Sequence, residues 1–173
     1  KAAQARLSSP VGRRYHFYDR GLWETTVLER DMADSMDHAL QINEFVVYYQ
    51  PKVSVLDQRI VGAEALARWR HPQRGMLSPD MFLELAERYQ KITHIDRFVF
   101  ENVCATLARW KKQGREICPI SLNLARADLD LPNLADERYE ICCRYGVEPA
   151  SIEFELKESL LLENLERAKS LVE

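Results

Sequence analysis

The residues best suited to chemistry in this sequence are a glutamate and an arginine on one face of a strand-like segment. Residues 60–69 read Ile-Val-Gly-Ala-Glu-Ala-Leu-Ala-Arg-Trp, with the short length and β-branched start typical of a strand. Successive side chains of a strand point to opposite faces, so Glu64, Leu66 and Arg68 share one face and alanines occupy the other. Taken alone, this segment fits a metal and anion site and a solvated surface ion pair equally well.

Two later segments carry polar groups in the same alternation. The segment 117–124 has Asn123 on the face opposite to its leucines, and 151–157 has Glu155 and Lys157 opposite to its apolar residues. Parallel strands covered by helices are normally apolar on both faces, and burying an unpaired carboxylate is costly. We therefore expect the polar faces of these strands to line one shared cavity.

The ligand chemistry of this set is narrow. Glu64, Asn123 and Glu155 supply carboxylate and amide oxygens, which suit Mg²⁺, Mn²⁺ or Ca²⁺, and the set lacks the Cys and His ligands that zinc prefers. A divalent ion beside Arg68 suits a phosphodiester, because the ion polarises a phosphoryl oxygen and a guanidinium binds other phosphate oxygens in a bidentate way. The pattern predicts a metal-assisted phosphodiester site.

The elements that must position these residues alternate along the chain. Pro51 in the first strand cannot donate a ladder hydrogen bond, so that strand is expected to end, bulge or lie at an edge there. Alternating strands and helices imply parallel strands covered by helices, and a barrel of this kind holds catalytic groups at the carboxyl ends of its strands. The expected strands are 45–55, 60–69, 117–124 and 151–157, and the expected helices are 22–43, 79–88, 94–113, 134–145 and 160–173, with a loop at 70–77.

Five stretches of the sequence match one series of motifs, in the same order. They are Tyr49-Gln50-Pro51-Lys52, Gly62 to Trp69, His71-Pro72 to Ser78-Pro79, Ser121-Leu122-Asn123-Leu124, and Glu153 to Ser159. This series resembles the EAL domain, a family of bacterial cyclic di-GMP phosphodiesterases with a TIM-like barrel. The resemblance implies an α/β fold of the TIM-like (β/α) barrel type, whose first strand runs antiparallel to the others.

The resemblance also implies roles for individual residues. Glu64 would be the catalytic, metal-binding glutamate, with Asn123 and Glu155 as further metal ligands. Gln50 and Arg68 would contact the dinucleotide, and Leu66 would line its site. Glu158, also placed in the catalytic set, would steady a loop that organises the metal site and the dimer. The implied cofactor is Mg²⁺ or Mn²⁺, and the implied reaction is hydrolysis of cyclic di-GMP to linear pGpG.

Three segments are expected along the chain. Residues 1–20 resemble the end of a GGDEF domain, on the strength of the run Gly-Arg-Arg-Tyr-His-Phe-Tyr at 12–18. Residues 21–43 would form a linker helix whose methionine stripe packs in a core rather than forming a binding groove. Residues 44–173 would form the N-terminal part of an EAL domain, so the parent is expected to be a GGDEF–EAL tandem.

The chain is expected to be an excerpt that carries about the first half of the barrel. It begins at Lys1 without Met and ends at Glu173 inside a predicted helix. The Asp-Asp-Phe-Gly motif and the catalytic lysine of the family would lie beyond that residue, so this piece itself is expected to be inactive. Lys157 stands where the family usually has Thr. It leaves open a second interpretation, that of a receptor that binds cyclic di-GMP without cleaving it.

Composition excludes several classes of partner. The 173 residues carry a formal net charge of −3, which implies no bulk attraction to nucleic acid polymers or to an anionic membrane. No apolar run approaches the roughly 20 residues of a membrane span. The four cysteines have no zinc-binding or disulfide-framework spacing and are read as reduced thiols of a cytoplasmic protein. The resemblance adds cyclic di-GMP as a ligand and allows a homodimer.

Overall fold

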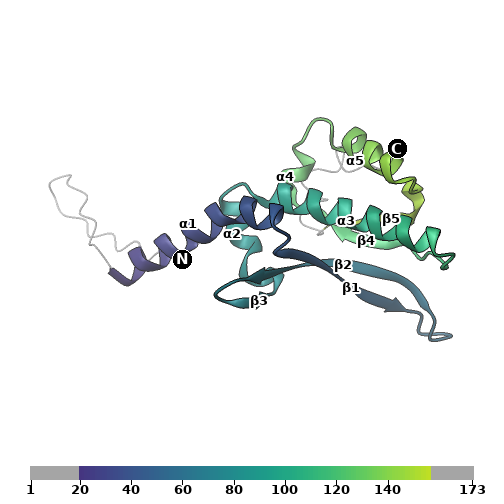
Figure 1. Cartoon of the computed structure of the whole chain (residues 1–173), viewed down its shortest axis with the longest axis horizontal. Coiled ribbons are helices and arrows are strands. Elements are labelled where there is room, and N and C mark those ends of the chain that lie inside the picture. The colour runs from purple at the N-terminus through teal and green to yellow at the C-terminus, as the bar shows by residue number, and fades with distance from the viewer. Residues whose placement is uncertain (1–19, 157–173) are drawn as a thin grey trace, which may run out of the picture.

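The computed structural model describes the backbone of residues 20–156 and the side chains of residues 29–156 (Figure 1). The predictions made for residues 1–19 and 157–173 lie outside this part of the chain. These predictions include the upstream-domain tail, Lys157, Glu158 and the helix 160–173.

A mixed sheet forms the base of the described chain. Its strands are β1 (Phe45–Val53), β2 (Ile60–His71), β3 (Gly75–Leu77), β4 (Ile120–Asn123) and β5 (Ile152–Glu155). They lie in the order β1-β2-β4-β5, and β3 pairs with β2. β1 is antiparallel to β2, whereas β2, β4 and β5 are parallel. The antiparallel first strand and the parallel arrangement of β2, β4 and β5 are thus confirmed.

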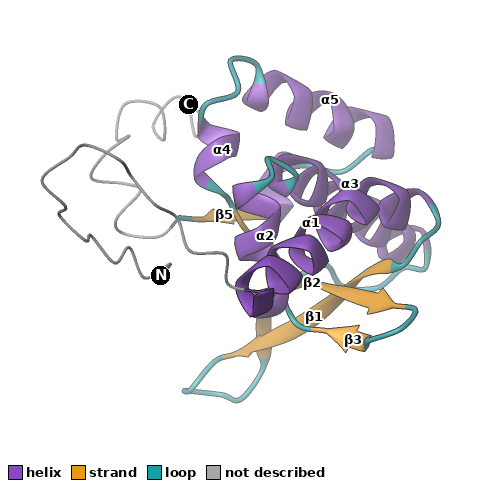
Figure 2. Ribbon diagram, turned by 90° about the vertical axis from the view of Figure 1, so that its left-hand side faces the viewer, coloured by secondary structure: helices purple, strands orange, loops and turns teal. Residues whose placement is uncertain are grey.

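The helices gather on one side of this sheet (Figure 2). They are α1 (Arg20–Gln41), α2 (Leu83–Arg88), α3 (Ile92–Lys112), α4 (Arg126–Leu129) and α5 (Leu134–Tyr145), with 3₁₀ turns η1 (Pro79–Met81) and η2 (Pro149–Ser151). Within the described part of the chain, the opposite face of the sheet carries no helix. That uncovered face is the one that displays the polar side chains of the strands.

The core lies between the sheet and α3. Trp69 and Phe45 are almost fully buried, and their rings stack with centroids 5.0 Å apart. The apolar face predicted for α3 packs there as well, because Ile95 and Val103 have no exposed surface. Ala65 is also buried, as predicted for the alanine face of β2, so small residues face the helices where polar residues face away.

Two local predictions were wrong. The expected loop 70–77 is a hairpin, because β2 continues to His71 and β3 returns along it with Trp69 opposite Leu77. The expected helix 79–88 is broken at Phe82, whose φ of −131° is not helical. The fully buried ring of Phe82 packs edge-on against Phe45, with ring centroids 5.4 Å apart. The helix is therefore interrupted at the residue whose ring enters the core.

The expected irregularity at Pro51 and the expected helix stops are confirmed. β1 has β2 as its one described neighbour, and the register of the pair shifts between Lys52 and Val53. Gly114 and Gly146 follow α3 and α5 with φ of 67° and 65°, a left-handed conformation in which a Cβ is strained.

The helix α1 docks on α2 and α3 through apolar and charged contacts. Met36 is fully buried, so the methionine stripe belongs to the core, as predicted. Asp37 forms an ion pair with Lys91 and a hydrogen bond with His94, whose Nδ1 lies 2.8 Å from the carboxylate. None of the helices that the structure describes is both long and apolar enough to span a membrane.

Candidate functional site

The candidate site lies on the uncovered face of the sheet, where three parallel strands bring polar groups together. The register sets Glu64 of β2 opposite Ser121 of β4, and Asn123 of β4 opposite Glu155 of β5. The Asn123 side-chain amide donates a hydrogen bond of 2.7 Å to Glu64 Oε1. The three oxygen-bearing residues predicted from the sequence therefore lie on adjacent strands, toward the carboxyl ends of β4 and β5.

Glu155 is paired with a lysine that the predictions assigned no role. Lys52 of β1 donates a hydrogen bond to Glu155 Oε1, although β2 and β4 lie between the two strands. That hydrogen bond, and a second one from Ser121, hold the pKa of Glu155 below its usual value. Glu155 is therefore an anion whose charge is already balanced by a neighbouring cation.

The three residues assigned to the dinucleotide lie on the same face of the β1–β2 hairpin as Glu64. Gln50 of β1 is exposed and lies opposite Glu64. Leu66 and Arg68 continue that face along β2 and are partly buried. The Arg68 guanidinium lies 5.8 Å from the ring centroid of Tyr48 and donates a 2.8 Å hydrogen bond to the Ala67 carbonyl. Its planar fork therefore lies over an aromatic ring on the face that carries Glu64.

The donor set is compatible with a hard divalent cation. Glu64, Asn123 and Glu155 offer two carboxylates and an amide, the oxygen ligands that Mg²⁺ and Mn²⁺ accept. Among the described residues, no group of three or more His, Cys, Asp and Glu side chains could hold a metal ion. The set therefore depends on its amide as third ligand, and the metal-binding roles remain predictions.

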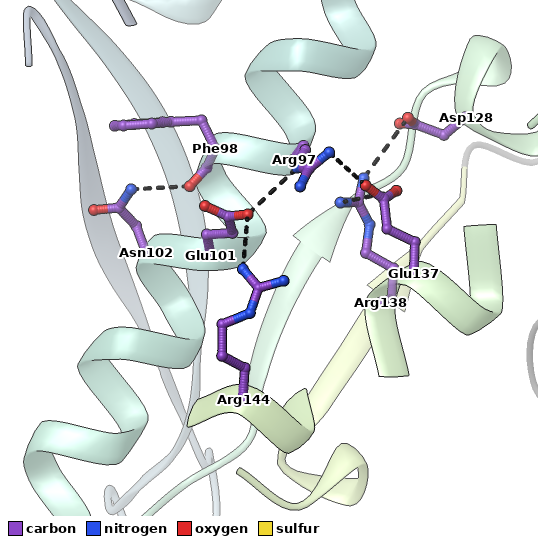
Figure 3. Close-up of polar contacts among 8 residues, drawn as sticks. All are labelled: Arg97, Phe98, Glu101, Asn102, Asp128, Glu137, Arg138 and Arg144. Carbon is purple, nitrogen blue, oxygen red and sulfur yellow. Dashed lines mark hydrogen bonds and ion pairs between the residues drawn. The ribbon is translucent and has the colours of Figure 1, made fainter. Parts of the chain in front are cut away.

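Behind the site, on the helical side of the sheet, lies a buried cluster that the sequence analysis missed. The backbone N–H of Ala125 donates to Asp96 Oδ2 of α3 at 3.3 Å. Asp128 of α4 is fully buried, and Arg138 of α5 reaches its Oδ1 at 3.9 Å with only 5% of the side chain exposed (Figure 3). The Arg138 guanidinium also lies 5.0 Å from the ring centroid of Phe100.

The two aspartates of this cluster favour a shared proton. Neither side-chain oxygen of Asp128 has a hydrogen-bond partner among the described residues. Burial, followed by the hydrogen bond and the charge of Asp128, raises the pKa of Asp96 well above its usual value. A protonated Asp96 supplies the missing donor. Asp96 interrupts the apolar stripe directly after Ile95, and that interruption is the sequence signal that could have identified it.

Three consecutive residues at the carboxyl end of β4 each contact a different element. The side chain of Asn123 contacts Glu64 of β2, the N–H of Leu124 donates to the Glu155 carbonyl at 3.0 Å, and the N–H of Ala125 reaches Asp96 of α3. The segment 123–125 is thus held from both sides of the sheet, and the orientation of Asn123 is set by these contacts.

The comparisons with known proteins identify the family. Residues 33–173 match the EAL domain. The chain belongs to the EAL domain family. The match begins inside α1 and includes every strand that the structure describes.

Relatives of this EAL domain include a signalling protein and an enzyme. An uncharacterized signalling protein of Caulobacter vibrioides is 34% identical over 89% of this chain and 18% of its own length. The cyclic di-GMP phosphodiesterase NbdA of Pseudomonas aeruginosa is 30% identical over 91% of this chain and 20% of its own length. The chain therefore spans about a fifth of the length of these curated relatives.

The solved structure of the MucR phosphodiesterase of Pseudomonas aeruginosa, a complex with c-di-GMP, has the same fold. It superposes with a TM-score of 0.76 at 29% identity, over 82% of this chain and 59% of its own. The TIM-like α/β fold with an antiparallel first strand is confirmed, and the chain corresponds to part of that fold.

Proposed function

We propose that the polypeptide carrying this chain is a metal-dependent phosphodiesterase that hydrolyses cyclic di-GMP to linear pGpG. The observation that supports this most directly is the gathering of Glu64, Asn123 and Glu155 on one uncovered face of three parallel strands. The names of NbdA and MucR, which are cyclic di-GMP phosphodiesterases, point to the same substrate.

In this proposal the carboxylates and the amide hold Mg²⁺ or Mn²⁺. A bound ion of this kind would polarise a phosphoryl oxygen and make an attacking water more acidic. The chain's own part is to keep two negative charges and one amide oxygen at fixed positions. The hydrogen bond between Asn123 and Glu64 serves this purpose, because it limits the rotamers of both side chains.

Arg68, Gln50 and Leu66 would bind the dinucleotide. The Arg68 guanidinium carries five donors in a planar fork, and a phosphate can replace the weak contact with the Tyr48 ring. Gln50 is exposed opposite Glu64 and can donate or accept a hydrogen bond. Glu158 would steady a neighbouring loop, on the resemblance alone, and a homodimer and a cytoplasmic location belong to the same proposal.

The test is Glu64→Gln in the natural polypeptide that carries this chain. The rate of conversion of cyclic di-GMP to pGpG is measured by chromatography of reactions that contain Mg²⁺ or Mn²⁺. It is expected to fall by at least about a hundredfold, because a ligating anion is lost. Glu87→Gln, an exposed glutamate on α2, is the matched control and is expected to keep full activity. Undiminished hydrolysis in Glu64→Gln would remove Glu64 from the metal site.

A receptor that binds cyclic di-GMP without cleaving it is the second candidate. The observation that favours it is the ion pair of Glu155 with Lys52, which engages a carboxylate that the enzyme needs for its metal. Calorimetric binding of cyclic di-GMP with no pGpG formed, at any Mg²⁺ or Mn²⁺ concentration, would establish the receptor and reject the enzyme.

A further inference from the structure

A lysine side chain crosses the uncovered face of the sheet to reach the candidate metal site. Lys52 lies on β1 and its partner Glu155 on β5, three strand spacings away in the order β1-β2-β4-β5. In a flat sheet the two strands would be about 14 Å apart, and the register places Glu155 further along the strands than Lys52, too far for the two side chains to meet. The contact therefore requires that the sheet curve toward this face, as in the wall of a barrel.

Lys52 lies beside a glycine of the neighbouring strand. The register sets Lys52 opposite Gly62, and a Cβ built on Gly62 would lie 3.7 Å from Lys52 Cδ. The aliphatic part of the lysine thus lies directly over the glycine of β2. On β4, the next strand, the small Ser121 is fully buried and contributes a hydrogen bond to Glu155.

In the described chain, the charged groups that act on Lys52 are all negative. Glu155 contacts it directly, and Glu153 and Glu64 add to the attraction from β5 and β2. The side chains of Lys52 and Glu155 are 39% and 40% exposed, so the pair is open to solvent and to ions. An entering cation can reach the carboxylate without first unfolding any part of the sheet.

We propose that Lys52 is the resident cation of the candidate metal site, which neutralises Glu155 until a divalent ion takes its place. This inference rests on the proposed function, because it requires Glu155 to be a metal ligand. Lys52 and the ion compete for one carboxylate. The lysine therefore weakens metal binding and raises the metal concentration at which the site fills.

The test is the affinity of Mn²⁺ for the natural polypeptide, measured by isothermal titration calorimetry and by the electron paramagnetic resonance of free Mn²⁺. Lys52→Met removes the charge and keeps the apolar stem. It is expected to tighten Mn²⁺ binding by about two- to fivefold, the range that a half-exposed ion pair supplies. Lys52→Arg keeps the cation. Lys112→Met removes an exposed charge at the C-terminal end of α3. Both variants are expected to bind Mn²⁺ as the unaltered protein does.

The outcomes separate this inference from the proposed function. If the unaltered protein binds no Mn²⁺, both fail together. A second outcome is that the unaltered protein binds Mn²⁺, that Glu155→Gln abolishes this binding, and that Lys52→Met leaves it unchanged or weaker. In that case the proposed function stands and the role of Lys52 is refuted. Lys52→Gln is a second variant that removes the charge with a polar side chain. Circular dichroism checks that each variant is folded, and the two charge-removing variants are expected to agree.

Discussion

Replacing Asp96 by asparagine tests the proton shared within the buried cluster. Asparagine has the shape of a protonated aspartic acid, so its NH₂ can donate to Asp128 and its oxygen can still accept from Ala125. We expect Asp96→Asn to change the free energy of unfolding at pH 4 by less than about 1 kcal/mol. Arg138→Met, in contrast, leaves buried negative charge without its cation and is expected to destabilise by about 3–5 kcal/mol.

The pH dependence of this effect has a definite sign. The pKa of Asp96 is raised in the folded chain above its ordinary value of 3.8, so folding takes up a proton when the pH lies between the ordinary and the folded pKa. The contribution of Asp96 is complete below pH 3.8 and is lost as pH rises toward its folded pKa, at about 1.4 kcal/mol per pH unit. Asparagine has no such loss. Asp96→Asn is therefore expected to gain stability relative to the unaltered protein between pH 4 and pH 7.

Urea unfolding followed by circular dichroism, at intervals from pH 4 to pH 7, measures this difference in the natural polypeptide. Asp31→Asn, an exposed aspartate on α1, is the matched control and is expected to show no relative change with pH. A loss of more than about 2 kcal/mol in Asp96→Asn at pH 7, with a pH dependence like that of the unaltered protein, would mean that Asp96 is ionised in the folded chain.

Three further predictions concern other parts of the chain. Arg68→Lys is expected to weaken cyclic di-GMP binding by about tenfold or more in calorimetry, because the bidentate fork is lost; equal affinity would exclude a phosphate contact. Hydrogen bonds with Lys91 and His94 lower the pKa of Asp37. Asp37→Asn should therefore lower the free energy of unfolding by at most about 1 kcal/mol at pH 7 and by nothing below the folded pKa, as thermal melting at several pH values would reveal. Iodoacetamide should modify exposed Cys143 in the native protein but not Cys104, whose pKa burial raises to about 12, and mass spectrometry that found both modified alike would contradict this burial.

The face assignments could be predicted from the sequence because they depend on local alternation alone. Glu64 and Arg68 face away from the helices and Ala65 faces them, as the two-residue period requires. The pairing of β1 with β2 was equally accessible, since a short turn joins two strand-like runs. The order of motifs then placed the parallel strands.

Contacts between distant residues could not be predicted in the same way. Lys52 shares its face with Gln50, but its partner Glu155 is 103 positions further along the chain, and only the curvature of the sheet brings them together. Asp128 and Arg138 likewise meet through the packing of short helices on α3, and α4 itself was not expected. The polar residues at 70–77 carry no strand signal, so the sequence predicts a loop where the structure has a hairpin.

The contacts that hold residues 123–125 affect the conformational entropy that ligand binding would cost. Fixing the backbone of one residue costs roughly 1–2 kcal/mol. Because Asn123, Leu124 and Ala125 are already held by β2, β5 and α3, that ordering occurs when the chain folds and not when a ligand arrives. In the proposed metal site, Asn123 would therefore be a preorganised ligand, and a cation would spend none of its binding free energy on ordering this segment.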